Sequence, residues 1–92
     1  MRGRMSLANG TPSVRIWVIG TRRVLGVVQQ DERFNDLPLS IRRAWAAGGD
    51  EAMWRSDLFG DFRVCSLSRR RPGRMQLVSL EGATGLRLRP RP

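Results

Sequence analysis

Apolar and polar positions alternate in two parts of the chain in the way that is typical of β-hairpins. The first part covers residues 14–30, where mostly β-branched or aromatic residues are divided by the polar segment 20–23. The second part covers residues 62–81 and is divided by residues 69–74, which contain Pro72-Gly73. We expect two hairpins. The second should have a loop rather than a tight turn, because a type II turn at Pro72-Gly73 would splay the strands.

Between the two hairpins the spacing of apolar residues changes to that of a helix. Four residues share one helical face: Leu37, Ile41, Ala44 and Trp45. Asp36 suits the N-cap position of this helix, and Gly48-Gly49 ends it. A second short helical turn is expected from Asp50, before residues 56–60 break the chain.

This order of elements predicts the fold class. Strand, strand, helix, strand, strand indicates one α+β domain over residues 14–81, with a small antiparallel β-sheet of about four strands and one helix on a face. A small bent β-barrel with an inserted helix is the alternative. Residues 1–13 have the composition of a flexible tail, and residues 82–92 that of an extended, Arg- and Pro-rich tail. In the second tail, alternating Leu and Arg could add an edge strand as far as Arg89.

Charge makes the chain unusual for its size. It has 92 residues, 17 arginines, no lysine and a formal net charge of +9, while a hydrophobic fraction of 40% indicates a folded protein. Arginine binds phosphate or carboxylate bidentately, but GC-rich codon usage would also replace lysine by arginine. The distribution is therefore more informative. Residues 31–62 hold seven of the eight acids, and the chain on either side is strongly basic.

Missing residue types exclude the commonest catalytic sites. Without His, Lys or Tyr, the chain has no usual general base and no serine or cysteine triad. Cys65 is the one cysteine, and its position on a predicted strand indicates a small core residue. No phosphate-binding loop or metal-ligand spacing is present. We expect a protein that is not an enzyme and has no metal or cofactor. With no disulfide pair, signal peptide or bilayer-spanning run, it should be cytoplasmic.

The basic hairpin loop suggests the first functional hypothesis, contact with nucleic acid, RNA or DNA, or with a nucleic-acid-handling complex. Seven arginines are candidates for this contact, and the last three extend the patch if the hairpins are neighbours: Arg69, Arg70, Arg71, Arg74, Arg63, Arg22 and Arg23. The tryptophans Trp17, Trp45 and Trp54 could stack on bases, but their apolar positions favour core packing.

A protein-binding inhibitor or adaptor is the second hypothesis. Small, non-enzymatic chains of this kind resemble, in general profile only, the accessory proteins with which phages and plasmids block host defences, including anti-CRISPR proteins. The acidic and aromatic middle of the chain offers a possible second contact: Asp50, Glu51, Trp54, Asp57 and Phe59. A homodimer is also possible, because the strand at residues 14–19 has apolar side chains on both faces.

Overall fold

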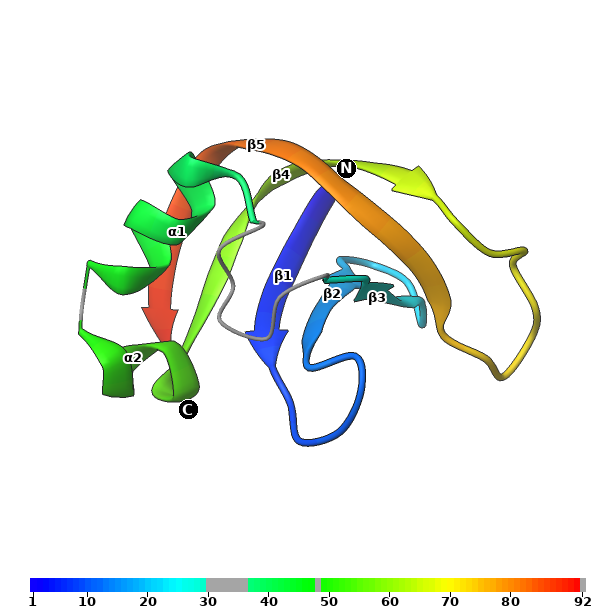
Figure 1. Cartoon of the computed structure of the whole chain (residues 1–92), viewed down its shortest axis with the longest axis horizontal. Coiled ribbons are helices and arrows are strands. Elements are labelled where there is room, and N and C mark those ends of the chain that lie inside the picture. Colours follow the sequence, from blue (N-terminus) through cyan, green and yellow to red (C-terminus); the bar gives the residue numbers. More distant parts are fainter. Residues whose placement is uncertain (30–36, 48, 92) are drawn as a thin grey trace.

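Five strands form a closed barrel in the computed structural model, which describes residues 1–29, 37–47 and 49–91, and only the backbone of residues 50–52. The strands are β1 (Arg2–Leu7), β2 (Val14–Val18), β3 (Val24–Val27), β4 (Ser56–Ser66) and β5 (Gln76–Pro90). They are ordered β1-β2-β3-β5-β4, and β4 pairs with β1 to close the barrel (Figure 1). All neighbours are antiparallel except β3 and β5, which are parallel.

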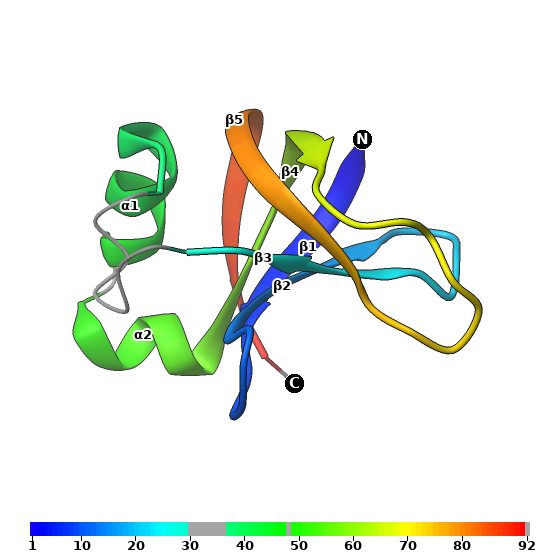
Figure 2. The same cartoon turned by 45° about the vertical axis from the view of Figure 1, so that its right-hand side comes forward.

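The two helices lie between β3 and β4 in the sequence and pack on one side of the barrel. They are α1 (Leu39–Ala46) and α2 (Asp50–Arg55), and Figure 2 shows them opposite the long loop that joins β4 to β5. Ile41 and Trp45 are fully buried, as the helical spacing predicted. No helix in the described ranges is long and apolar enough to cross a membrane.

Alternation along the strands builds the core. Along β1 and β2, Met5, Val14 and Ile16 point inward and are completely buried, while Arg4 and Trp17 lie on the outer face and remain partly exposed. Phe62 of β4 and Val78 of β5 complete the same core. Both predicted hairpins are confirmed, β2 with β3 and β4 with β5.

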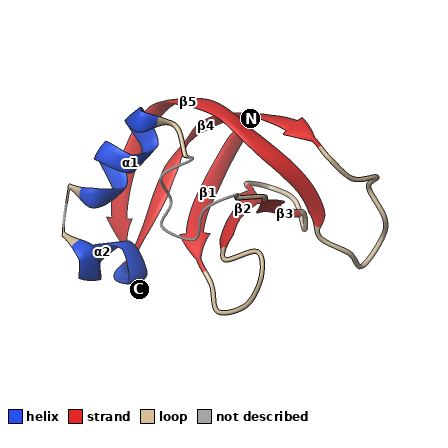
Figure 3. Cartoon of the chain, in the orientation of Figure 1, coloured by secondary structure: helices blue, strands red, loops and turns tan. Residues whose placement is uncertain are grey.

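The four-stranded sheet is the part of the fold prediction that needs correction. The alternative, a small bent barrel with an inserted helix, is the observed architecture, and Figure 3 shows strands and helices in these separate regions. Closure comes from β1, which pairs with both β2 and β4. A closed barrel leaves no sheet edge, so every strand has a partner on each side.

The strand that the prediction lacked is β1, which lies in a segment whose composition predicted a flexible tail. Residues 2–7 form β1 because Met5 and Leu7 alternate with polar residues and fill the core. At the other end β5 continues to Pro90, because Leu86 and Leu88 pack against the core between outward-facing arginines. Residues 56–60, expected to be a break, begin β4.

The start of the first helix also differs from the prediction. Pro38 occupies the N-cap position of α1 and no side chain caps the helix. Asp36, the predicted cap, lies outside the described residues. The second helix begins at Asp50 with Gly49 as its N-cap, close to the expected place.

Candidate nucleic-acid interface

The loop between β4 and β5 has an ordered base and a tight turn at its tip. At the base, the Leu67 amide donates to the Leu77 carbonyl at 2.8 Å, and the Leu77 amide donates to Ser68 Oγ at 2.9 Å. At the tip, the Arg74 amide donates to the Arg71 carbonyl at 3.1 Å. Gly73 between them has a φ of 74°, which glycine adopts without strain. The expected longer loop is confirmed.

Several hydrogen bonds hold the turn between β2 and β3. The amide and the hydroxyl of Thr21 both donate to the Val18 carbonyl, at 3.1 and 2.7 Å. The indole Nε1 of Trp17 donates to the Thr21 carbonyl at 2.7 Å. This turn therefore presents Arg22 and Arg23 from a fixed backbone.

Gln76 joins the two hairpins at this end of the barrel. Its Oε1 accepts a hydrogen bond from the Arg23 guanidinium at 2.6 Å. Its Nε2 donates to Ser66 Oγ and to the Ser68 carbonyl, both at 3.1 Å. The β2–β3 turn and the β4–β5 loop, about 50 residues apart in sequence, are thereby held side by side.

An open groove of about 690 Å³ lies between these two segments, and we call it the arginine groove. Residues 21–25 line one wall and residues 70–76 the other. The lining contains no acidic residue and five arginines: Arg22, Arg23, Arg70, Arg71 and Arg74. Arg23 is engaged by Gln76, whereas the other four guanidinium groups have no hydrogen bond or ion pair within the described residues. Four arginines that line the groove thus have no internal counter-charge among the described residues.

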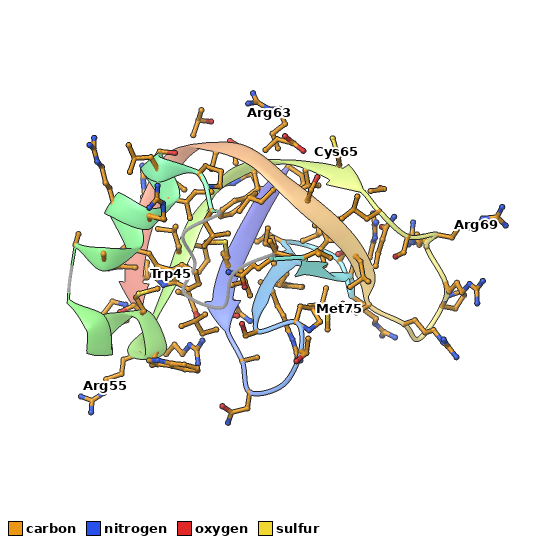
Figure 4. The ribbon with its side chains drawn as sticks, in the orientation of Figure 1. Trp45, Arg55, Arg63, Cys65, Arg69 and Met75 are labelled. Carbon is orange, nitrogen blue, oxygen red and sulfur yellow. The ribbon has the colours of Figure 1, made fainter. Side chains whose placement is uncertain are left out.

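Apolar side chains complete the lining. Val24 is 38% exposed although it belongs to a strand, and Leu25, Pro72 and Met75 lie along the same groove. Met75 is labelled in Figure 4 near the start of β5, close to β3. Guanidinium groups together with an apolar surface are suited to a ligand that carries both negative charge and flat apolar faces.

Two of the predicted arginines do not line the groove. Arg69 belongs to the loop but projects from its outer side, as Figure 4 shows. Arg63 lies on the outer face of β4 with its guanidinium over Gly82 of β5, away from the loop. The sequence placed Arg63 beside the loop because the two are close along the chain, but β4 carries it along the barrel.

The residues of the predicted second contact differ in their exposure. Asp57 is 7% exposed and binds Arg91, whose Nε lies 2.8 Å from Oδ1, so it is structural. Trp54 on α2 is 52% exposed, and Phe59 is half-buried on the barrel wall. Asp50 and Glu51 belong to α2, but their side chains lie outside the described part of the structure.

The predicted burial of three aromatic and sulfur-containing residues needs correction. Trp45 packs in the core as expected, but Trp17 is only half-buried and Trp54 is exposed. Cys65 is exposed rather than a core residue, because it alternates with the inward-facing Val64 on β4.

Gln76, Val24 and Met75 belong to the groove and were missed as site residues. Gln76 had one signal in the sequence, since it is polar and directly precedes an apolar strand segment. Val24 and Met75 had none, because apolar residues in predicted strands are normally assigned to the core. Their exposure follows from where the two hairpins meet.

The described residues contain no group of three or more acidic or cysteine side chains that could hold a metal ion. Comparisons with known proteins add no relative, since no family model, curated protein or solved structure matches the chain.

Proposed function

We propose that this protein binds nucleic acid in the arginine groove and that it acts by binding rather than by catalysis. The observation that carries the proposal is the convergence of five arginines from two distant segments on one open groove without an acidic residue. Phosphate groups are the ligands that such a cluster favours, because each guanidinium can donate two parallel hydrogen bonds to phosphate oxygens.

The charge of the whole chain supports the same ligand. With a formal net charge of +9, the protein attracts polyanions over a long range. The four groove arginines without an internal partner are the positions where phosphate groups would bind. An acidic protein surface would satisfy the arginines equally, but it would not need the apolar lining formed by Val24 and Met75. Nucleobases offer flat faces that pack on apolar and guanidinium surfaces.

The architecture is compatible with this proposal. A five-stranded barrel with a helix between its third and fourth strands resembles the OB-fold, whose sheet face and loops bind oligonucleotides in many proteins. A fold does not determine a function, so this likeness is secondary to the chemistry of the groove.

One observation favours a second candidate function, that of a protein-binding inhibitor or adaptor. Trp54 and Leu39, on the two helices, are each more than half exposed, at 52% and 51%. Exposed tryptophan is frequent at the centres of protein interfaces. A pull-down from host lysate after nuclease treatment separates the two functions. A stoichiometric protein partner that persists favours the adaptor, and loss of all partners favours nucleic acid.

The proposal predicts that removing groove arginines weakens nucleic-acid binding. The variant carries Arg70→Ala, Arg71→Ala and Arg74→Ala, and it should bind a labelled oligonucleotide at least tenfold more weakly than the unchanged protein at low salt, because three phosphate contacts are lost. Fluorescence anisotropy measures both affinities. The three residues are exposed, so the fold should be unaffected.

A second triple variant is the matched control for charge. Arg43→Ala, Arg63→Ala and Arg89→Ala removes the same charge from exposed positions outside the groove. Its affinity should fall less than threefold, since only long-range attraction changes. Equal losses in the two variants would show that binding is diffuse and would contradict a site in the groove.

A further inference from the structure

A row of alternating aromatic and basic side chains crosses the outer wall of the barrel beside the arginine groove. The pairing of the strands defines the members of this row. Trp17 of β2 pairs with Arg4 of β1, Arg4 pairs with Phe59 of β4, and Phe59 pairs with Arg87 of β5. Paired residues in a sheet point to the same face, so all four belong to one outer surface. We call them the aromatic–basic row.

Trp17 and Arg4 are already arranged as a stack. The Arg4 guanidinium carbon lies 4.8 Å from the centroid of the Trp17 ring. The Arg4 side chain is 43% exposed, so part of it is open to solvent, and its Nε also lies 3.8 Å from the Asp57 carboxylate. The Trp17 indole is fixed by its hydrogen bond to Thr21, a residue that lines the groove. The row therefore begins at the groove wall.

The far end of the row opens into a small pocket. Its volume is about 230 Å³, and its lining includes Phe59, Arg87 and Arg2 together with the exposed acidic residue Asp61. The guanidinium groups of Arg2 and Arg87 have no hydrogen bond or ion pair among the described residues. The pairing of β4 with β5 shifts register beside Phe59, at Gly60, which also lines the pocket. Such an irregularity bends the strand and redirects neighbouring side chains.

We propose that the aromatic–basic row is a second contact surface for a single-stranded nucleic acid, which leaves the arginine groove, crosses β2, β1 and β4, and ends at the pocket beside Arg2 and Arg87. This inference rests on the proposed function of the groove. Unpaired bases stack on the aromatic ring of Phe59 and on the exposed part of the Arg4 guanidinium. Arg2 and Arg87 bind phosphate groups.

Strand spacing distinguishes a single strand from a duplex. The Arg4 guanidinium lies over Trp17 on β2, so the stacking position that it offers is about two strands, roughly 10 Å, from Phe59 on β4. Successive bases in a duplex strand are only about 3.4 Å apart and are covered on both faces. A single strand can splay its bases to meet two separate stacking positions. A duplex could contact the arginines of the row but not the aromatic ring.

The test compares an unstructured single-stranded DNA of about 12 nucleotides, a length within the usual range for one barrel, with the duplex of the same sequence. Anisotropy titrations use the full chain and the variant Phe59→Leu, which keeps an apolar side chain but removes the ring. The unchanged protein should bind the single strand more tightly than the duplex. Phe59→Leu should weaken single-strand binding roughly tenfold and leave duplex binding unchanged.

Two further variants keep the test decisive. Trp54→Leu removes an exposed aromatic ring on α2, outside the row, and should change neither affinity. Arg87 is exposed, so the variant Arg87→Gln should fold and tests the row even if Phe59→Leu fails to fold. Arg87→Gln should weaken single-strand binding about threefold.

Three results would overturn the inference. The first is equal affinity for single strand and duplex. The second is single-strand binding that stays unchanged in both Phe59→Leu and Arg87→Gln while the groove triple variant still loses affinity, which leaves the groove proposal standing. The third is absence of binding by the unchanged protein, which rejects the groove and the row together.

Discussion

Single arginines in this protein have different roles according to their neighbours. Arg91 is structural, because its Nε lies 2.8 Å from the carboxylate of Asp57 and one terminal nitrogen donates to the Leu7 carbonyl at 2.8 Å. These contacts tie the end of β5 to β1 and β4. Arg70 and Arg71, by contrast, line the groove, and their side chains have no partner among the described residues. Residue type alone does not separate the two roles, since they depend on where the acids lie.

Asp57→Asn should destabilise the fold. The substitution removes the charge that Arg91 and Arg4 share at the closure of the barrel, and a hydrogen bond between charged groups contributes about 1.5–3 kcal/mol. Because Arg91 is partly exposed, we expect the lower part of this range, a loss of about 1.5–2 kcal/mol. Urea unfolding followed by circular dichroism measures it.

Asp61→Asn is the control for this measurement, since it changes an exposed carboxylate on the same strand. Its effect should stay within about 0.5 kcal/mol. If the two variants unfold at the same urea concentration, Asp57 does not hold the end of β5.

At the scale of elements, the arginine groove depends on contact between two hairpins. The β2–β3 turn supplies residues 21–25 and the β4–β5 loop supplies residues 70–76. Gln76 is the hydrogen-bonded link between them, with Arg23 on one side and Ser66 and Ser68 on the other. The backbone pairing of β3 with β5 also holds the two walls together, and Gln76 adds a side-chain link that carries none of the binding charge.

Gln76→Leu tests this dependence without changing net charge. Loss of its hydrogen bonds should lower the free energy of unfolding by about 1 kcal/mol and release Arg23. Affinity for a single-stranded oligonucleotide should fall about three- to tenfold, because the groove must be ordered on binding. Calorimetric titration beside urea unfolding gives both quantities.

Ser79→Ala, which removes one exposed hydrogen bond farther along β5, is the control for Gln76→Leu and should leave affinity unchanged. Unchanged affinity in Gln76→Leu itself would mean that the groove forms without the link.

The elements that could be predicted from the sequence are those with local patterns. Both hairpins and the buried face of α1 follow from alternation and helical spacing in continuous segments. The loop arginines were also identifiable, because they are adjacent to one another in the chain. The strand β1 was missed because Gly3 takes an inward position where the pattern calls for an apolar side chain. An added Cβ there would lie 2.5 Å from Ile16, so the barrel requires glycine.

At the scale of the whole molecule, the order of strands could not be predicted. Closure needs β1 to pair with β4 and β3 to run parallel to β5, and both pairings join segments far apart in the sequence. Periodicity within a segment carries no information on such partners. The same pairings bring the two hairpins together and assemble the aromatic–basic row, so the groove lining and the row became visible only with the fold.

The closed barrel also separates the surfaces of the molecule. The helices, with the exposed Trp54, cover one side, and the arginine groove lies at the opposite side with the β4–β5 loop (Figure 2). Nucleic acid in the groove would leave the helices accessible. Binding of a polyanion and contact with a protein partner are therefore compatible in one molecule.

The central claim is that groove arginines neutralise phosphates, and the salt dependence of binding tests it most directly. The logarithm of the binding constant for a single-stranded oligonucleotide is measured against the logarithm of salt concentration, for the unchanged protein and for the Arg70, Arg71 and Arg74 alanine variant. For the variant, the slope should be shallower by about 2, because three phosphate contacts are lost. Parallel lines for the two proteins would contradict the claim.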